Sequence, residues 1–265
     1  MARLQILGTQ AYPRNGEPVH LRLVDGDDHL LVDCGPNIVG TFDALERPLT
    51  SVTDLFVTHS HADHALGVPY FLLGHFLTRA GAVADDPGTD VPPLTIRGPE
   101  SALEAVDACL EAVTPGFDAL AGDASWTLEP TEPGDGFDVG DVTVTPLPAD
   151  HVVPTQGLLF DGERRIAYTG DTTRSEALVD AVDRADVVIH ESMYLESEAD
   201  LARELKHGTA REAGRFAADV EADELYLVHV SDQYGDEQRV RFLEEAGEAF
   251  DGEIVLPNRF DELSV

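Results

Sequence analysis

The strongest chemical signal in the chain is a short polar stretch at residues 58–64, which reads Thr-His-Ser-His-Ala-Asp-His and directly follows an apolar run. Side chains two residues apart in an extended segment point the same way, so His59 and His61 can share one metal ion. If the chain then turns into a helix, Asp63 and His64 can reach a second ion. Imidazole and carboxylate ligands suit Zn²⁺, Fe²⁺, Mn²⁺ or Co²⁺, so the stretch predicts a site for divalent metals.

Three further residues of ligand type, His151, Asp171 and His229, each come at or just beyond the end of an apolar stretch typical of a strand. Loops at strand ends are where a rigid scaffold gathers functional side chains. The predicted metal ligands are therefore His59, His61, Asp63, His64, His151, Asp171 and His229.

The elements that must position these residues alternate along the chain. Short apolar runs bounded by turn residues predict strands at 3–8, 19–24, 29–34, 54–58, 94–97, 126–129, 142–146, 157–160, 165–169, 187–190, 224–229 and 254–256. Apolar residues at helical spacing and helix-start signals predict helices at 65–80, 99–113, 175–184, 209–220 and 237–250, and loops are predicted at 84–93 and 114–125. Two sheets packed face to face with helices outside would bury this pattern. We predict an α/β fold, a four-layer αββα sandwich, in one domain over residues 1–265.

The charge of the chain is strongly unbalanced, with 17 basic residues against 51 acidic ones and a net charge of −34; Lys206 is the single lysine. The regular apolar strands argue against intrinsic disorder. Such an acidic, lysine-poor composition is typical of a halophilic protein, because in molar salt the Debye length falls to about 3 Å and self-repulsion is screened.

Segments that would place the protein in a membrane or an oxidising compartment are missing from the sequence. Apolar runs fall short of the roughly 20 residues that a membrane span needs, and the N-terminus lacks a signal-peptide pattern. The two cysteines, Cys34 and Cys109, are too few for a disulfide framework and are expected to be small buried side chains. We expect a cytoplasmic protein without membrane contact.

The chain resembles the metallo-β-lactamase superfamily, from Leu7-Gly8-Thr9 through Asp33-Cys34-Gly35 to His229. The resemblance implies two metal ions, with Zn²⁺ expected first and Mn²⁺, Fe²⁺ or Co²⁺ as alternatives. A hydroxide between the ions would be the nucleophile. The implied ligands are His59, His61 and His151 for the first ion and Asp63, His64 and His229 for the second, with Asp171 bridging them.

Asp33 is not a ligand in this arrangement. Two roles stay open for it: its carboxylate can orient a ligand from behind, or it can shape the turn at Cys34-Gly35.

Two short segments narrow the resemblance to one branch of the superfamily. Ile189-His190-Glu191-Ser192 and the run His-Gly-Thr-Ala-Arg-Glu-Ala at 207–213 look like two motifs of the tRNA-processing endonuclease branch, ribonuclease Z, and residues 94–100 also resemble it. The resemblance places Glu191 and His207 beside the metals. A histidine kept cationic by a carboxylate can protonate a leaving oxygen. The predicted catalytic residues are Asp63, Glu191 and His207; the alternative is that His207 merely precedes a helix and Glu191 ends a strand.

The chain departs from that branch in the segments that would grip RNA. Ribonuclease Z carries a basic arm for tRNA, whereas the corresponding stretch here, residues 114–123, is short and contains no Lys or Arg. The run of small residues expected after Leu7-Gly8-Thr9 is replaced by other residues. With so few basic residues, the composition also argues against a strongly basic face, the usual mark of nucleic-acid binding. The sequence therefore favours a phosphodiesterase acting on a small phosphodiester or single-stranded nucleic acid. An acyl-ester, lactone or thioester hydrolase and an inert metal-binding scaffold are the alternatives; the resemblance also implies a homodimer.

Overall fold

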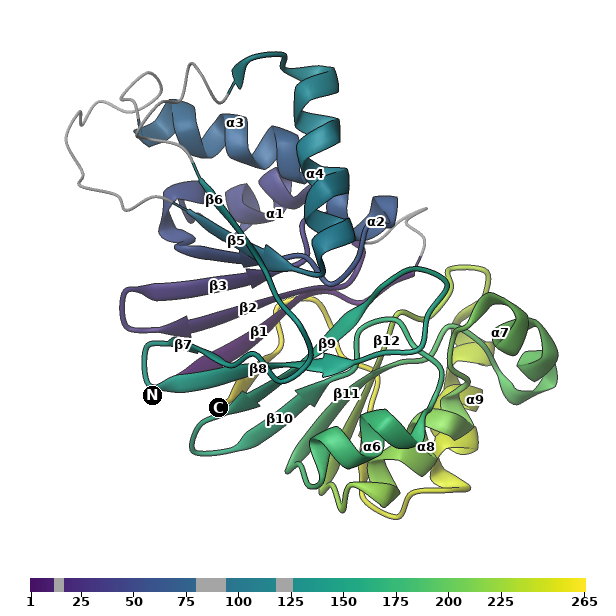
Figure 1. The fold of residues 1–265 in the computed structure, drawn as a ribbon. Coiled ribbons are helices and arrows are strands. Elements are labelled where there is room, and N and C mark those ends of the chain that lie inside the picture. The colour runs from purple at the N-terminus through teal and green to yellow at the C-terminus, as the bar shows by residue number, and fades with distance from the viewer. Residues whose placement is uncertain (12–16, 80–93, 118–125) are drawn as a thin grey trace.

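The structure, a computed structural model, describes residues 1–11, 17–79, 94–117 and 126–265. These residues form two seven-stranded sheets packed face to face. Helices cover the outer face of each sheet, giving four layers (Figure 1). The predicted αββα sandwich is thereby confirmed, whereas the assignment of the whole chain to one domain stays a prediction.

The first sheet is antiparallel on one side and parallel on the other. Strand β14 pairs with β1, β1 with β2 and β2 with β3 in antiparallel fashion, and the pairs from β3 to β6 are parallel. In spatial order the strands are β14 (Glu262–Ser264), β1 (Arg3–Gly8), β2 (His20–Asp25), β3 (Asp28–Val32), β4 (Asp54–Phe56), β5 (Thr95–Gly98) and β6 (Thr127–Pro130).

The second sheet repeats this division. Its strands from β10 to β13 are parallel, and those from β7 to β10 are antiparallel. In spatial order they are β13 (Glu253–Val255), β12 (Glu224–Val228), β11 (Val187–Glu191), β10 (Arg165–Tyr168), β9 (Gln156–Asp161), β8 (Val142–Pro148) and β7 (Phe137–Val139).

Helices follow the parallel strands and return the chain to the start of the next one, as parallel pairing requires. Those of the first half are α1 (Ile38–Ala44), η1 (Leu49–Ser51), α2 (Ala62–Ala65), α3 (Val68–Arg79) and α4 (Glu100–Val113). Those of the second half are α6 (Glu176–Val182), η3 (Glu196–Glu198), α7 (Ala199–Leu205), α8 (Ala210–Asp219) and α9 (Asp236–Gly247). None of the helices in the described ranges is long and apolar enough to cross a membrane.

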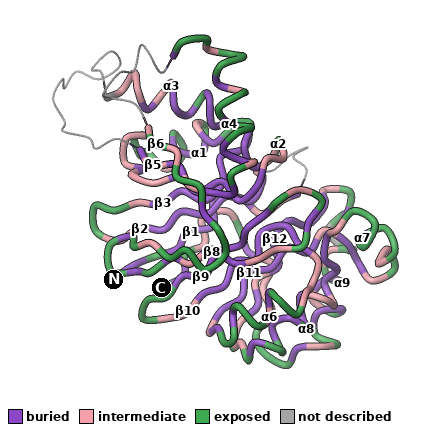
Figure 2. The backbone as a smooth tube through the Cα atoms, in the orientation of Figure 1, coloured by how far each residue is buried: buried purple, intermediate pink, exposed green. Residues whose placement is uncertain are grey.

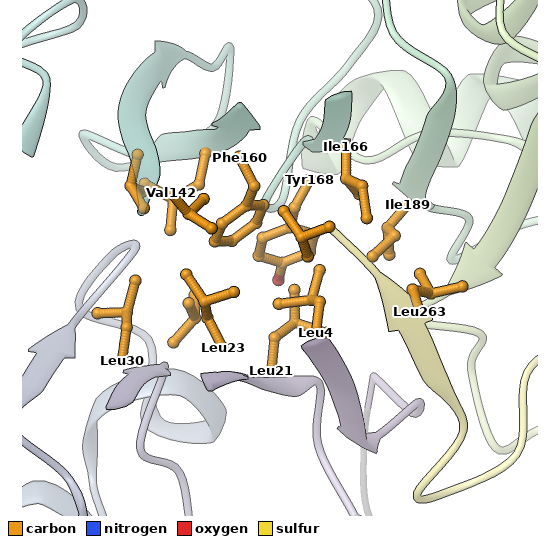
Figure 3. Close-up of a cluster of buried hydrophobic side chains, with 14 of the residues drawn as sticks. Leu4, Leu21, Leu23, Leu30, Val142, Phe160, Ile166, Tyr168, Ile189 and Leu263 are labelled. Carbon is orange, nitrogen blue, oxygen red and sulfur yellow. The ribbon is translucent and has the colours of Figure 1, made fainter. Parts of the chain in front are cut away.

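The core between the sheets is built from alternate residues of facing strands. Leu4 and Leu21 of the first sheet meet Phe160 and Tyr168 of the second, all nearly inaccessible to solvent (Figure 3). Two further apolar clusters lie between each sheet and its helices. The strands are accordingly buried along most of their length, while the helices expose one face (Figure 2). This rigid double sheet fixes the positions of the loops at the strand ends.

One predicted helix, at residues 65–80, is wrong in its extent. The chain instead forms the single turn α2 and then α3, with Gly67 between them. Gly67 donates its N–H to the carbonyl of Cys34 at 2.8 Å, and a Cβ there would lie 2.1 Å from the carbonyl oxygen of Gly35. The break is therefore imposed by close packing of two backbone segments. The predicted loop at 84–93, and residues 118–125 of the one at 114–125, lie outside the described residues.

Candidate metal centre

All seven predicted ligands lie together at one edge of the molecule. They come from the loops and short turns after β4, β8, β10 and β12, at the carboxyl ends of these strands. Their candidate ligand atoms form a first group of His59, His61, His151 and Asp171 and a second group of Asp63, His64 and His229, and the atoms of each group lie within 4.8 Å of one another. A third group, of Asp171, His207 and His229, overlaps both. The structure thus brings together the same two sets that the family resemblance implies.

The carboxylate of Asp171 stands between the two groups. Its Oδ2 lies 3.7 Å from Nε2 of His59, 3.5 Å from Nε2 of His64 and 3.4 Å from Nε2 of His229. Asp63 Oδ2 lies 3.6 Å from the same nitrogens of His64 and His229. These separations exceed those of good hydrogen bonds and leave room for an ion among the ligand atoms.

Whether these residues suit a metal ion can be judged from the buried ring nitrogens that lack a hydrogen-bond partner. Nε2 of His59, Nε2 of His64 and both ring nitrogens of His229 are buried and lack hydrogen-bond partners among the described residues. Unpaired buried polar atoms are costly and rare in native proteins. Each of these three rings directs an unpaired Nε2 toward Asp171, so the donor set fits divalent metal ions.

A buried carboxylate behind the site orients His64. Oδ2 of Asp33 accepts a hydrogen bond from Nδ1 of His64 at 2.8 Å, which leaves Nε2 of this ring as the ligand atom. Both residues are fully buried. Of the two roles open for Asp33 from the sequence, the structure favours orientation of a ligand, although its backbone also adopts the left-handed conformation at φ 62°.

Thr58 extends this support to His59. Its hydroxyl donates to Asp33 at 2.9 Å, and its backbone N–H donates to the same carboxylate at 2.8 Å. Because the hydroxyl proton is used in this way, Nδ1 of His59, 3.0 Å away, is the donor to Thr58 Oγ1. The Nε2 of His59 is again left toward the site. Sequence reasoning missed Thr58.

A main-chain carbonyl orients His151. Nδ1 of this ring donates to the carbonyl of Lys206 at 2.9 Å, and its Nε2 lies 3.3 Å from Nδ1 of His61. The Lys206 side chain also contacts the loop that carries His151, with its Nζ 2.6 Å from Oδ1 of Asp150. Lys206 closes α7 in the left-handed conformation, which turns its carbonyl toward His151.

The histidine-rich turn packs against the loop after β3. Gly35 donates its N–H to Nε2 of His20 at 2.9 Å, and a Cβ at Gly35 would lie 1.8 Å from the carbonyl oxygen of Asp63. Burial and the charge of His64 lower the pKa of His20 to about 3, in keeping with its role as a neutral acceptor. His20 is thus a buried support for the site.

Glu191 and His207 form a pair beside the two groups. Glu191 is buried, and its Oε1 accepts from Nδ1 of His207 at 2.9 Å and from the backbone N–H of Thr172 at 3.0 Å. Its other oxygen accepts from the N–H of Met193 at 3.2 Å. Glu191 therefore fixes the orientation of the His207 ring through Nδ1.

The surroundings of His207 favour its protonated form. Burial lowers the pKa of His207, but the charge and hydrogen bond of Glu191 and the charge of Asp171 outweigh burial and raise it to about 9. The His207 ring also stacks on His229, with centroids 5.3 Å apart. Nδ1 of His207 is 4.0 Å from Asp171, and these two residues form a further group of candidate ligand atoms with His229.

Other histidines and the two cysteines lie outside the centre. His190 is buried against Phe216 as a core residue, and His29 lies at the far end of β3. Cys34 is buried, as expected, and Cys109 is only partly so.

Comparison with known proteins places the chain in a family. Residues 28–230 match the Beta-lactamase superfamily domain. Ribonuclease Z of Halorubrum lacusprofundi is 31% identical over 282 aligned positions, which cover 90% of this chain and 88% of that protein. Ribonuclease Z of Haloferax volcanii is 30% identical over 312 positions, covering 99% and 95%. The chain therefore belongs to the beta-lactamase superfamily and, within it, to the ribonuclease Z-like branch of metal-dependent hydrolases. The predicted superfamily, branch and enzyme class are confirmed.

Solved structures share the fold over the whole chain. The metallo-beta-lactamase fold protein YhfI from Bacillus subtilis superposes with a TM-score of 0.77 at 21% identity and full coverage of both chains. The short form of human tRNase Z gives 0.75 at 20% identity, covering 99% of this chain and 98% of that one. A diphosphatase of the PhnP family gives 0.75 at 15% identity, with 100% and 98% coverage.

Proposed function

We propose that the chain is a dinuclear metal-dependent phosphodiesterase. His59, His61 and His151 would hold one ion, Asp63, His64 and His229 would hold the other, and Asp171 would contribute to both; Zn²⁺ is the first candidate. The convergence of unpaired buried nitrogens on Asp171 supports this assignment. When bound, the ions supply an activated water and Lewis acidity toward phosphoryl oxygens.

The observation that carries the reaction class is the pair of Glu191 and His207. A phosphodiester needs a proton for its leaving oxygen, and a positioned acid contributes typically 10²–10⁴-fold to the rate. Glu191 fixes Nδ1 of His207 at 2.9 Å, so Nε2 is the atom from which the proton leaves. Asp63, whose side chain is 22% exposed, faces the same space and is proposed to orient the attacking water.

The preferred substrate is proposed to be a small phosphodiester or single-stranded nucleic acid. The alignment with the Haloferax volcanii protein spans 312 positions, more than the 265 residues of this chain, so that relative carries inserted segments that this chain lacks. Phosphate contacts normally position a nucleic acid on a protein. A chain without a basic arm at 114–123 and with a net charge of −34 is poorly equipped to hold a folded tRNA.

A substrate panel in molar KCl with Zn²⁺ or Mn²⁺ tests this proposal. Bis(p-nitrophenyl) phosphate and short single-stranded RNA should be hydrolysed faster than pre-tRNA, and p-nitrophenyl acetate should turn over slowly. Site-specific cleavage of pre-tRNA as the fastest reaction would overturn the substrate assignment. Preferential hydrolysis of the acyl ester would instead support an ester hydrolase, and a metal-loaded protein inert toward all four would support a binding scaffold.

A homodimer, implied by the family resemblance, is part of the same proposal. Leu66 and Tyr70, on the segment that carries Asp63 and His64, expose large apolar side chains and offer a surface for it. Light scattering in molar KCl should give twice the chain mass of 28.6 kDa; the mass of a single chain would contradict a dimer.

A further inference from the structure

A polar pocket lies on the outer face of the first sheet, away from the metal centre. It is formed at the turn between β2 and β3, whereas the metal ligands lie beyond the opposite ends of β3 and β4 (Figure 1). Its volume is about 410 Å³, within the range typical of small-molecule sites. The charged and titratable side chains that line it are Arg3, Arg22, Asp27, His29, Arg47 and Glu262.

Arg22 is buried in this pocket without a carboxylate partner. The residue is 6% exposed, and its Nη2 lies 3.0 Å from Nδ1 of His29. Because a guanidinium only donates, Nδ1 of His29 is the acceptor and the imidazole is neutral. Nε of Arg22 is buried and has no hydrogen-bond partner among the described residues. The guanidinium otherwise lies over the ring of Phe42, 5.9 Å from the ring centroid. A buried charge with only neutral partners in contact is costly unless an anion joins it.

The nearby carboxylates do not supply that anion. Glu262 is engaged by Arg3 and by Gln5, each at 3.3 Å. Among the described carboxylates, none lies within 4.0 Å of the guanidinium of Arg22 or Arg47. Burial lowers the pKa of Arg22, and the charges of Arg47 and Arg3 lower it further, whereas the charge of Glu262 is a smaller effect that raises it. The repulsion among the three cations across the pocket is therefore only partly offset.

The pocket therefore keeps a net positive charge, from three guanidiniums against two carboxylates, on a protein whose net charge is −34. Arginine presents a planar set of donors that matches the oxygens of carboxylates and phosphates, and such charge-assisted bonds are strong. We propose that this pocket is an anion site for a small molecule carrying a tetrahedral oxyanion, with phosphate as its chemical class, held by Arg22 and Arg47.

Calorimetric titration of the metal-loaded protein with inorganic phosphate in molar KCl tests the site. Arg47 is exposed, so Arg47→Ala should fold normally and bind phosphate about tenfold more weakly, the worth of one charge-assisted hydrogen bond. Arg22→Met should abolish binding there. The matched control is Arg203→Ala, because Arg203 is an exposed arginine paired with Asp200 at 2.9 Å outside the pocket; it should bind phosphate like the wild type.

Phosphate can also bind a metal centre, so its inhibition of bis(p-nitrophenyl) phosphate hydrolysis is measured in parallel. The inhibition constant should be the same in Arg47→Ala and in the wild type, since the pocket and the metal centre are separate. A parallel titration with sulfate shows which tetrahedral oxyanion the pocket prefers. A higher affinity for phosphate supports a phosphorylated ligand, and a higher affinity for sulfate contradicts it. The anion site would be overturned if the wild type and Arg47→Ala bound phosphate with equal affinity. It would also be overturned if titration with chloride alone gave the same heat as titration with phosphate.

Discussion

Oε1 of Glu191 accepts hydrogen bonds from Nδ1 of His207 and from the backbone N–H of Thr172, the residue that follows Asp171. One buried oxygen thus fixes the proposed proton donor relative to the loop that carries Asp171. Glu191 comes from the end of β11, and His207 from the turn between α7 and α8. A change at Glu191 should consequently disturb the orientation of His207 more than the binding of metal.

Replacement of His207 by Ala should lower the hydrolysis of single-stranded RNA by about 10²–10⁴-fold, because the leaving oxygen loses its proton donor. The loss should shrink for bis(p-nitrophenyl) phosphate, whose leaving group needs little protonation. Steady-state rates on both substrates measure this difference, and elemental analysis should find unchanged metal content. Equal rates of the wild type and the variant on RNA would refute the assignment of His207 as the acid.

The Glu191→Gln variant tests whether Glu191 acts by positioning and charging His207. The amide oxygen can still accept from His207, but the charge that keeps the imidazole cationic is gone. We expect a smaller loss than in His207→Ala, with the same dependence on the leaving group. A similar loss on both substrates, or loss of metal, would show that Glu191 supports the fold of the site and not the proton donor.

Asp33→Asn should weaken metal binding by about 10–100-fold, the usual effect of removing a group that orients a ligand. His64 loses its charged acceptor, and the hydroxyl of Thr58 loses the same partner. Competition with a chelator measures the affinity. Asp27→Asn, at an exposed turn, is the matched control and should retain the metal; equal retention by both variants would leave Asp33 as a turn former only.

The seven candidate ligands stand out in the sequence because each lies at the end of an apolar strand or a few residues beyond it. An orienting role for Asp33 is one of two that the sequence leaves open, but the backbone supports could not be predicted, because they depend on contacts between distant segments: the carbonyl of Lys206 meets His151, and that of Asp63 approaches Gly35. Backbone carbonyls carry no sequence signal of this kind.

Among the elements, those missed are short and weakly patterned. Strands β7 and β14 have three residues each at sheet edges, and α1 contains Gly40 and β-branched residues that disfavour helix. Helix α7 buries little more than Ala202, so it lacks an apolar stripe to detect.

His61→Ala should remove one ion per chain and nearly all hydrolysis. Its Nδ1 lies in the first group of ligand atoms, 3.3 Å from Nε2 of His151, and the remaining residues of that group cannot replace it. Elemental analysis of protein prepared in high salt without chelator should give about two ions for the wild type and about one for the variant. A metal-free wild type would contradict the metal centre itself.

The thermal midpoint should rise with salt, because the net charge of −34 repels itself most strongly when it is not screened. The Debye length falls from about 10 Å at 0.1 M salt to about 3 Å at 1 M, so most of the gain should occur in this interval. Screening depends on ionic strength and little on which monovalent salt supplies it, so NaCl and KCl should act alike. Potassium sulfate, which also strengthens apolar burial, should continue to stabilise the fold beyond that point. Differential scanning calorimetry of the metal-loaded protein measures the midpoint in each salt. A midpoint that stays constant as KCl is raised would show that the acidic surface is not an adaptation to salt.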